Sequence, residues 1–406
     1  MDVAIVGAGA AGLMAALFAA GDGRRVALLE RTRDGGRKIL ISGGGRCNIL
    51  PSDVEPEWFV TESSPHSLRN ILRGWPLGAQ RRFFEDDLGI RLALEPDTGK
   101  LFPASNRARD VRDRLVDCAR ARGAELRFGA RFVDLARAGD DWELTFDAGA
   151  PLRARTVVLA TGGLSVPLTG SDGTGLRLAE RLGHRMHATY PALTPLTTGV
   201  SRWTELSGVS LDAFLTAPPE TPRYSRPQGL LFTHRGFSGP SVLNISHVAT
   251  RPRAGAPPPI LARWGGMGRP EWEGELAAGG RTHLATVLRR HLPERLALAL
   301  LAEAGVSPDR LLAQLRREER DSVLTALTAM PLPVTGSEGY RKAEVTGGGV
   351  ALGEVDPRTM ESRRAPGLFL CGEMLDAFGP IGGFNFLWAW TTGRAAGLGA
   401  LQRVST

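Results

Sequence analysis

The sequence predicts an α/β protein whose main domain, built around a parallel sheet, is divided along the chain by an inserted β-rich domain with a helical part. In the 406-residue chain, apolar runs typical of buried parallel strands occur at 2–6 and 156–160 and again, much later, at 367–371. Between them prolines accumulate up to residue 259, and a helical pattern follows from residue 282. The expected parts are 1–190 and 336–406 for the main domain and 191–335 for the inserted domain, which is β-rich over 191–265 and helical over 280–330.

The other elements of the main domain follow from the periodicity of apolar residues. Helices are expected over 13–20, 65–88, 111–122 and 384–399. Segments in which apolar and polar residues alternate are expected to form a small antiparallel layer, at 125–128, 131–135 and 142–146.

The N-terminal 30 residues form a β-α-β unit, with a second strand at 26–29 that ends at Glu30. The turn after the first strand reads Gly7-Ala8-Gly9-Ala10-Ala11-Gly12. The first glycine of such a turn allows a sharp bend, the second lets backbone approach a pyrophosphate, and the third lets helix pack on strand. An acid 18 residues after Gly12 completes a dinucleotide-binding fingerprint. Glu30 is expected to accept hydrogen bonds from the adenosine ribose and to disfavour a 2′-phosphate.

This fingerprint suits NAD and FAD equally, and two later segments favour FAD. The strand at 156–160 runs into Thr161-Gly162-Gly163, which suits close approach to the middle of a long cofactor. The strand at 367–371 leads to Gly372 and Glu373, whose carboxylate suits a ribityl hydroxyl. The glycines before Phe384 open the closing helix, whose N-terminus could stabilise the negative charge of a reduced flavin.

With these motifs the chain resembles the flavoproteins with two dinucleotide-binding domains, which are loosely related to glutathione reductase and succinate dehydrogenase. Within them it resembles the bacterial family that includes aminoacetone oxidase and the BaiN-type bile-acid reductases. The matching segments are GAGAAGLMAA (7–16), GRKILISGGGRCN (36–48), ATGGLSVPLTGSDGTG (160–175), LFTHRGFSGPSVLNIS (231–246), VTGGGV (345–350) and 359–397. The resemblance implies a Rossmann-like FAD-binding domain of the glutathione-reductase type. One departure is Ile49-Leu50, where the family carries more polar residues, and this could alter the substrate pocket.

The resemblance also implies which residues meet the cofactor. Gly36, Arg37 and Lys38 would contact the phosphates, 42–48 would line the flavin, and the backbone of Val133 would meet the adenine. The full set expected to bind FAD is Gly7, Gly9, Ala10, Ala11, Gly12, Glu30, Arg31, Gly36, Arg37, Lys38, Ser42, Gly43, Gly44, Arg46, Cys47, Asn48, Val133, Ala160, Thr161, Gly162, Gly372, Glu373, Gly383, Phe384 and Asn385.

The residues that carry catalysis are less well defined, and three candidates each have a plain structural alternative. His234 could be an acid or base in the substrate pocket, or a structural histidine. Arg46 could hold an anionic substrate or the flavin, or form an ordinary salt bridge. Cys47 could be a redox thiol or a packing residue, because neither Cys118 nor Cys371 is nearby in sequence.

Composition narrows the remaining classes of protein. The 50 basic residues, of which only three are lysines, outnumber 43 acidic residues and give a net charge of +7. Because the arginines are scattered, we attribute this charge to genome composition and expect no nucleic-acid partner. Three isolated cysteines favour neither a disulfide framework nor a zinc site, and no metal is expected. No apolar run is long enough for a membrane span, so we expect a cytoplasmic protein.

The sequence therefore predicts an FAD-dependent oxidoreductase that transfers a hydride equivalent between flavin and a small organic substrate. It leaves open a reductase of a conjugated ketone or an oxidase of an amine or alcohol. The alternatives are an FAD-dependent RNA-modifying protein and a flavin-binding sensor without turnover. Because only one fingerprint is present, NAD(P)H is a candidate donor that would dock transiently. The sequence does not determine the oligomeric state.

Overall fold

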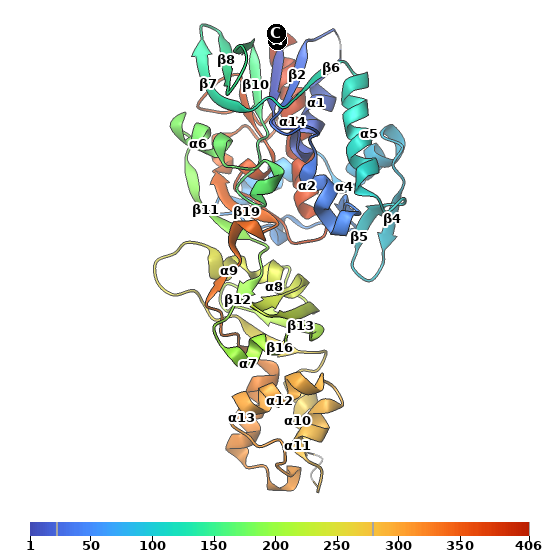
Figure 1. Cartoon of the computed structure of the whole chain (residues 1–406), viewed down its shortest axis with the longest axis vertical. Coiled ribbons are helices and arrows are strands. Elements are labelled where there is room, and N and C mark those ends of the chain that lie inside the picture. Colours follow the sequence, from blue (N-terminus) through green and yellow to red (C-terminus); the bar gives the residue numbers. More distant parts are fainter. Residues whose placement is uncertain (22, 278–279, 406) are drawn as a thin grey trace. The chain divides into compact units, whose positions relative to one another are not determined.

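The computed structural model describes residues 1–21, 23–277 and 280–405, which form two compact units (Figure 1). Unit 1 comprises Met1–Tyr190 and Val345–Thr406, and unit 2 comprises Pro191–Glu344. The second boundary therefore lies at residue 345, later than the expected 336. The reason is that β18 (Gly336–Ser337) pairs with β12 (Leu196–Thr197), which ties this part of the chain to the sheet of unit 2.

The centre of unit 1 is a five-stranded parallel sheet, as the sequence predicts. Its strands, in spatial order, are β20 (Leu368–Leu370), β10 (Thr156–Leu159), β1 (Val3–Val6), β2 (Val26–Glu30) and β6 (Ala124–Phe128). Every residue of β1, β2, β10 and β20 is buried. Apart from Thr156 and Glu30, the residues of these strands are apolar, because a parallel sheet is covered on both faces. The two distant stretches of chain meet here, since β20 pairs with β10.

Two helices pack closely against each other beside this sheet, α1 (Ala10–Ala19) and α14 (Phe384–Ser405). Gly393 and Gly397 of α14 allow this approach. A Cβ at these positions would lie only 2.3 Å and 2.4 Å from the carbonyl oxygens of Ala11 and Ala15. The closing helix extends six residues beyond the expected end at 399.

The small antiparallel layer differs from the prediction in one strand. It consists of β7 (Phe132–Ala138), β8 (Asp141–Phe146) and β9 (Leu152–Ala154). The segment expected as its first strand is β6, which pairs in parallel with β2. The helix α5 (Ala108–Ala121) precedes β6 and supplies the crossover that a parallel neighbour requires.

The remaining elements of unit 1 are short. The helices are α2 (Arg37–Ile41), α3 (Pro65–Arg73), α4 (Leu77–Arg82) and α6 (Thr174–Arg181). The strands are β3 (Leu50–Pro51), β4 (Leu92–Glu95), β5 (Lys100–Pro103), β11 (Met186–Ala192) and β19 (Val345–Val350). Ile49 and Leu50 are fully buried, and the Ile49 carbonyl oxygen accepts a hydrogen bond from Trp390. This departure from the family pattern therefore lies in the core.

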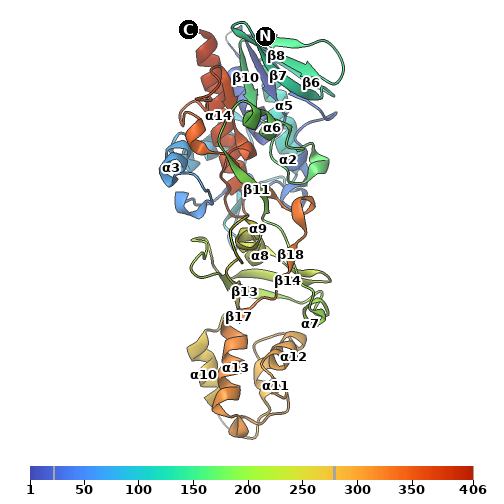
Figure 2. The same ribbon diagram turned by 90° about the vertical axis from the view of Figure 1, so that its left-hand side faces the viewer.

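Unit 2 contains a seven-stranded antiparallel sheet, formed by β12 and β18 with β13 (Ser210–Thr216), β14 (Gln228–Thr233), β15 (Gly236–Ser238), β16 (Leu261–Trp264) and β17 (Met330–Pro331). The helices of its second half are α10 (Arg269–Ala277), α11 (Leu284–Arg289), α12 (Glu294–Glu303) and α13 (Arg317–Thr328), which lie beside one another in Figure 2. The helices that come earlier in the chain are α7 (Ser201–Thr204), α8 (Pro240–Ile245) and α9 (His247–Thr250).

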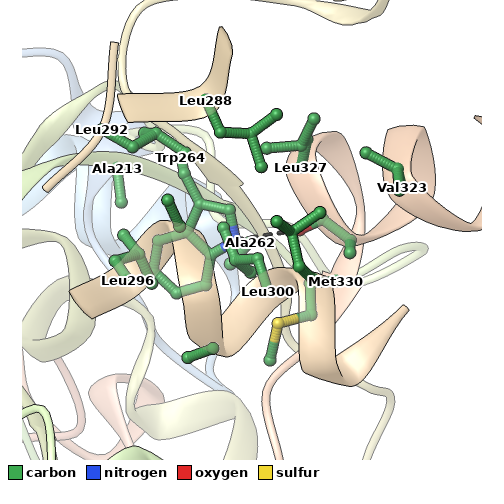
Figure 3. Packing of buried hydrophobic residues seen from close by; sticks show 14 of the residues in the cluster. Ala213, Ala262, Trp264, Leu288, Leu292, Leu296, Leu300, Val323, Leu327 and Met330 are labelled. Carbon is green, nitrogen blue, oxygen red and sulfur yellow. Dashed lines mark hydrogen bonds between the residues drawn. The ribbon is translucent and has the colours of Figure 1, made fainter. Parts of the chain in front are cut away.

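The sheet and the helices of unit 2 share one hydrophobic core (Figure 3). Trp264 of β16 is fully buried and donates a hydrogen bond of 3.0 Å to the carbonyl oxygen of Ala326 on α13. Leu288 of α11 and Leu300 of α12 belong to the same cluster. The β-rich and helical parts of the insertion are thus one folding unit. Within the described residues, no helix of either unit is long and apolar enough to cross a membrane.

Candidate cofactor site

The turn from β1 to α1 has the geometry that its glycines predict. Gly7 has a φ of 99°, and a Cβ there would lie 2.5 Å from the carbonyl oxygen of Ala160. A Cβ at Gly12 would lie 1.8 Å from the carbonyl oxygen of Gly7. Gly9 differs, because a Cβ there would meet no atom within 4 Å. No side chain caps the N-terminus of α1, so its first N–H groups are available to an anion beside Gly9.

Glu30, at the end of β2, is held in one orientation. Its Oε2 accepts a hydrogen bond of 2.8 Å from the Ala8 amide, and its Oε1 accepts one of 2.7 Å from the Thr32 amide. The residue is 8% exposed. A carboxylate offers about four lone-pair directions, so each oxygen retains capacity for a hydroxyl donor. This arrangement suits recognition of a ribose next to the first turn.

The segment 34–38 lies against the same turn and is braced by a residue that the sequence did not reveal. The Gly36 amide donates to the carbonyl oxygen of Ala8 at 2.7 Å. The buried Arg112 of α5 donates to the carbonyl oxygens of Asp34 and Gly35 at 3.0 and 3.3 Å. No pattern in the sequence singles out Arg112 among the arginines of α5.

Glu373, expected beside the ribityl chain, is the centre of a polar cluster. Its carboxylate pairs with Lys38 and accepts from the Ser165 hydroxyl. Oε1 also accepts from the Thr346 amide and hydroxyl, at 3.0 and 2.9 Å. Lys38, expected at the phosphates, also contacts Ser165 at 2.5 Å. The cluster joins α2, β19 and the turns that follow β10 and β20, which are four segments distant in sequence.

The glycine-rich loop 42–48 has an unusual backbone. Gly43, Gly44 and Gly45 have φ values of 55°, 67° and 84°, and Cys47 has one of 62°. A Cβ at Gly44 would meet nothing within 4 Å, so this part of the loop borders open space. Successive N–H groups in such conformations can face a ligand. The loop is therefore suited to the role that the family resemblance implies.

The N-terminus of α14 is joined to this loop. With its amide oriented to satisfy both neighbours, Asn48 donates to the Leu50 carbonyl oxygen and accepts from the Gly383 amide, each at 3.1 Å. Asn385 is engaged within its own turn, because it accepts from the Gly379 amide at 2.9 Å and donates to the Gly379 carbonyl oxygen at 3.0 Å. Phe384 is buried. The side chains of Phe384 and Asn385 thus shape the turn that presents the helix N-terminus.

The residues expected near the adenosine also lie around the end of β2. The Ala130 amide donates to the Glu30 carbonyl oxygen at 2.9 Å, which places the start of β7 beside Glu30. Val133 is the bulged residue of β7, skipped in its pairing with β8, and is 47% exposed. Arg31 pairs with Asp172, next to the chain that leaves β10. The positions Ala160–Gly162 lie at the end of β10, against Gly7 and Gly12.

The three catalytic candidates have different environments. Cys47 is fully buried, and this burial raises the pKa of its thiol to about 12, which disfavours a redox thiolate. Arg46 packs over the Phe102 ring at 3.9 Å and pairs with Glu95 at 3.1 Å, which is the ordinary salt bridge considered above. His234 is exposed, in the turn between β14 and β15 of unit 2.

These features fit a long dinucleotide along the edge where the parallel strands end. The open space at Gly9 and Gly44, the uncapped α1 and the oriented Glu30 each match one part of FAD. Reasoning from sequence missed Ser165 and Thr346, which complete the Glu373 cluster. Their presence in the two glycine-rich segments after β10 and within β19 was the only available signal.

Comparison with known proteins identifies the family to which the chain belongs. The model of the HI0933-like protein Rossmann domain matches residues 1–399. The chain is 35% identical over 400 residues to an Escherichia coli protein named ribosomal RNA dihydrouridine synthase, covering 96% of each chain. It is 31% identical over 414 residues to a 3-dehydro-bile acid delta(4,6)-reductase of Clostridium scindens, covering 99% of each.

Among solved structures, the 3-ketosteroid-delta4-(5alpha)-dehydrogenase of Rhodococcus jostii shares the fold. Its TM-score is 0.50 at 16% identity, over 98% of this chain and 96% of that chain. Identity this low supports the fold alone. The glycine-rich turn, the oriented Glu30 and the full-length family match lead to one conclusion: this chain belongs to the HI0933-like family of FAD-binding Rossmann proteins.

Proposed function

We propose that this protein is a flavin-dependent reductase of a carbon–carbon double bond conjugated to a carbonyl group. The observation that carries this proposal is the shared chemistry in the names of its two full-length relatives. Making dihydrouridine saturates the C5–C6 bond of uracil, which is conjugated to the C4 carbonyl. A delta(4,6)-reductase of a 3-oxo bile acid saturates bonds conjugated to the 3-oxo group. The coarser assignment, an FAD-binding oxidoreductase, follows from the family itself.

Such a reduction requires a hydride for the carbon β to the carbonyl and a proton for the carbon α to it. Bound FAD, once reduced, supplies the hydride. The chain's own residues would hold the cofactor: Glu30 at the ribose, the α1 N-terminus at the pyrophosphate and the loop 42–48 at the flavin. The α14 N-terminus would stabilise negative charge on the reduced ring.

The proton must come from a side chain or from solvent. Cys47 is unsuited, because a buried thiol with a pKa of about 12 is a weak acid. Arg46 is engaged with Glu95. His234, exposed in the turn between β14 and β15, remains the candidate acid.

The electrons must come from a separate two-electron donor. Because the chain carries one dinucleotide fingerprint, which we assign to FAD, a nicotinamide would bind transiently at the flavin. NADH and NADPH are therefore the first donors to test.

Anaerobic stopped-flow absorbance at the flavin band tests the proposal in two halves. The purified holoprotein is expected to bleach with NADH or NADPH and then to regain colour when a conjugated alkene is added. His234→Gln is expected to slow the second half alone. A flavin that is reoxidised by no conjugated alkene, but readily by oxygen, would show that the protein is an oxidase instead.

A uridine in RNA is a second candidate substrate, within the same chemistry. It is favoured by the relative of highest identity quoted above, whose name specifies ribosomal RNA. Nuclease digestion followed by mass spectrometry detects its product, because dihydrouridine is about two mass units heavier than uridine. A small enone such as a steroid 4-en-3-one, tested in parallel, separates the two substrate classes.

A further inference from the structure

One face of β5 contacts both of the segments that are assigned to the flavin ring. Phe102 packs against the loop 42–48, because a Cβ at Gly43 would lie 3.0 Å from a carbon of the Phe102 ring. Lys100 packs against the turn before α14, because a Cβ at Gly382 would lie 3.8 Å from both the Cγ and the Cε of the lysine. Side chains two residues apart in a strand point to the same side. Lys100 and Phe102 therefore lie on the face of β5 that meets the flavin-lining segments.

The position of Lys100 is fixed by strand pairing on both sides of β5. Lys100 is paired with Pro51 of β3 and with Glu95 of β4. The turn at Gly383 lies directly on β3, since a Cβ at Gly383 would come within 2.5 Å of the Leu50 carbonyl carbon. This close contact between strand and turn holds the side chain of Lys100 beside the N-terminus of α14.

The ammonium group of Lys100 forms no salt bridge and no side-chain hydrogen bond within the part of the chain that the structure describes. The carboxylate of its cross-strand neighbour, Glu95, is engaged by Arg46 at 3.1 Å and by the Thr98 hydroxyl at 2.5 Å. Hydrogen bonds from Thr98 and then Arg46 are the main reasons that the pKa of Glu95 is lowered, and the charge of Lys100 contributes only weakly. Two cations, Arg46 and Lys100, therefore share the field of one carboxylate.

Lys38, the other lysine of the cofactor site, has a different environment. It pairs with Glu373 and contacts Ser165, so its charge is offset. Lys100 is half-buried, and no acidic residue lies in the first turn of α14 beside it. The dipole of α14 adds partial positive charge at the same place. This edge of the site thus favours a neighbour that carries negative charge.

We propose that Lys100 is a catalytic residue whose ammonium group contacts the pyrimidine end of the flavin ring and stabilises the negative charge that the ring acquires on reduction. The inference rests on the placement of the ring between the loop 42–48 and the N-terminus of α14. It holds for any substrate of the proposed reduction. A cation beside this end of the ring makes the flavin a stronger electron acceptor, so a nicotinamide donor would reduce it more fully. Neither the hydride nor the proton passes through Lys100.

The test measures the midpoint potential of FAD bound to the whole protein, by anaerobic reduction together with a reference dye. Lys100→Met keeps an unbranched side chain and removes the charge. It is expected to shift the equilibrium toward oxidised flavin about tenfold or more, and each factor of ten lowers the potential by about 30 mV. Because the oxidised ring is neutral, the Kd for oxidised FAD is expected to change by less than about threefold.

Two further variants separate charge from packing. Lys100→Arg keeps the charge and is expected to have a potential close to that of the wild type. Arg153→Met is a matched control for net charge, because Arg153 is exposed and its carbonyl oxygen accepts a hydrogen bond from the Met1 ammonium, at the edge where the parallel strands begin. Its potential is expected to equal that of the wild type.

An unchanged potential in Lys100→Met would overturn the inference, as would an equal fall in Lys100→Arg or Arg153→Met. Failure of Lys100→Met to retain oxidised FAD would also overturn it, because that outcome would assign the side chain to folding or to holding the cofactor. The visible spectrum and the Tm, recorded for each variant, distinguish these two roles. The proposed reduction fails separately, if no conjugated alkene reoxidises the flavin while Lys100→Met shows the expected shift in potential.

Discussion

Two glycines of the first turn have opposite surroundings, so replacing each with alanine separates cofactor binding from folding. A Cβ at Gly9 would meet no atom within 4 Å, and its φ of −77° and ψ of −170° are accessible to any residue. A Cβ at Gly12 would lie 1.8 Å from the Gly7 carbonyl oxygen. The same methyl group therefore enters open space in one variant and a packed helix–strand contact in the other.

The expected magnitudes differ accordingly. Gly9→Ala loses no native contact, so the free energy of unfolding of the apoprotein is expected to change by less than about 1 kcal/mol. The methyl group would occupy the space assigned to the pyrophosphate, and the Kd for FAD is expected to rise at least tenfold, which is about 1.4 kcal/mol. Gly12→Ala is expected to destabilise unit 1 by about 1–3 kcal/mol through overpacking. Its Tm would fall by roughly 2–4 °C for each kcal/mol.

Thermal unfolding of the apoprotein and titration with FAD, followed by flavin fluorescence, measure the two effects separately. Gly353→Ala is a matched control, because its Cβ also meets open space but lies in the turn Leu352–Glu354, away from the first turn. Wild-type affinity for FAD in Gly9→Ala would refute the placement of the pyrophosphate against this turn. An equal loss of stability in both variants would refute the reading of the space around Gly9.

Three further outcomes follow from particular contacts. Glu373→Gln leaves Lys38 without its carboxylate and is expected to lower the free energy of unfolding of unit 1, measured with urea, by about 1–3 kcal/mol. The double variant Lys38→Met/Glu373→Gln should regain part of the lost stability, and no change in either variant would contradict the proposed cluster. Native Cys47, whose buried thiol has a pKa of about 12, is expected to resist iodoacetamide at pH 8 until the protein is unfolded, and rapid labelling detected by mass spectrometry would disprove this. Hydrogen bonds from Arg316 and, more weakly, Arg310 lower the pKa of Glu319 to about 2, so the stabilisation of α13 by the Glu319 carboxylate is complete above pH 4.5 and lost as the pH falls toward 2. The stability of the wild type should therefore fall more steeply with acid than that of Glu319→Gln, and identical profiles of stability against pH would exclude a contribution from Glu319.

The parallel sheet was predictable because its signal is local. β1, β2, β10 and β20 are short, mostly apolar runs, and burial on both faces requires that composition. The fingerprint around Gly7 was predictable because its spacing is local, although the atom that a Cβ at Gly7 would meet, the Ala160 carbonyl oxygen, lies far along the chain. The misplacement of the segment 125–128 shows the limit of such patterns. Alternation describes a half-buried strand, but pairing with β2 depends on the preceding helix α5.

The boundary of the insertion shows a second limit. The glycine-rich character that resumes near residue 336 suggested a return to the main domain. Composition cannot show that Gly336 and Ser337 hydrogen-bond with a strand about 140 residues earlier. Likewise, nothing in the sequence showed that the helices α10–α13 share their core with the β-rich part through Trp264.

The residues alone were sufficient to predict a dinucleotide site at Gly7–Gly12 and Glu30, because close backbone approach demands glycine and ribose recognition demands an acid at a set distance along the chain. Only the folded chain could reveal that Glu373 binds Lys38, Ser165 and Thr346, and that Arg112 braces Gly35. Such contacts join segments separated by tens to hundreds of residues, and the partner of a charged side chain is chosen by distance in space, which local sequence does not encode.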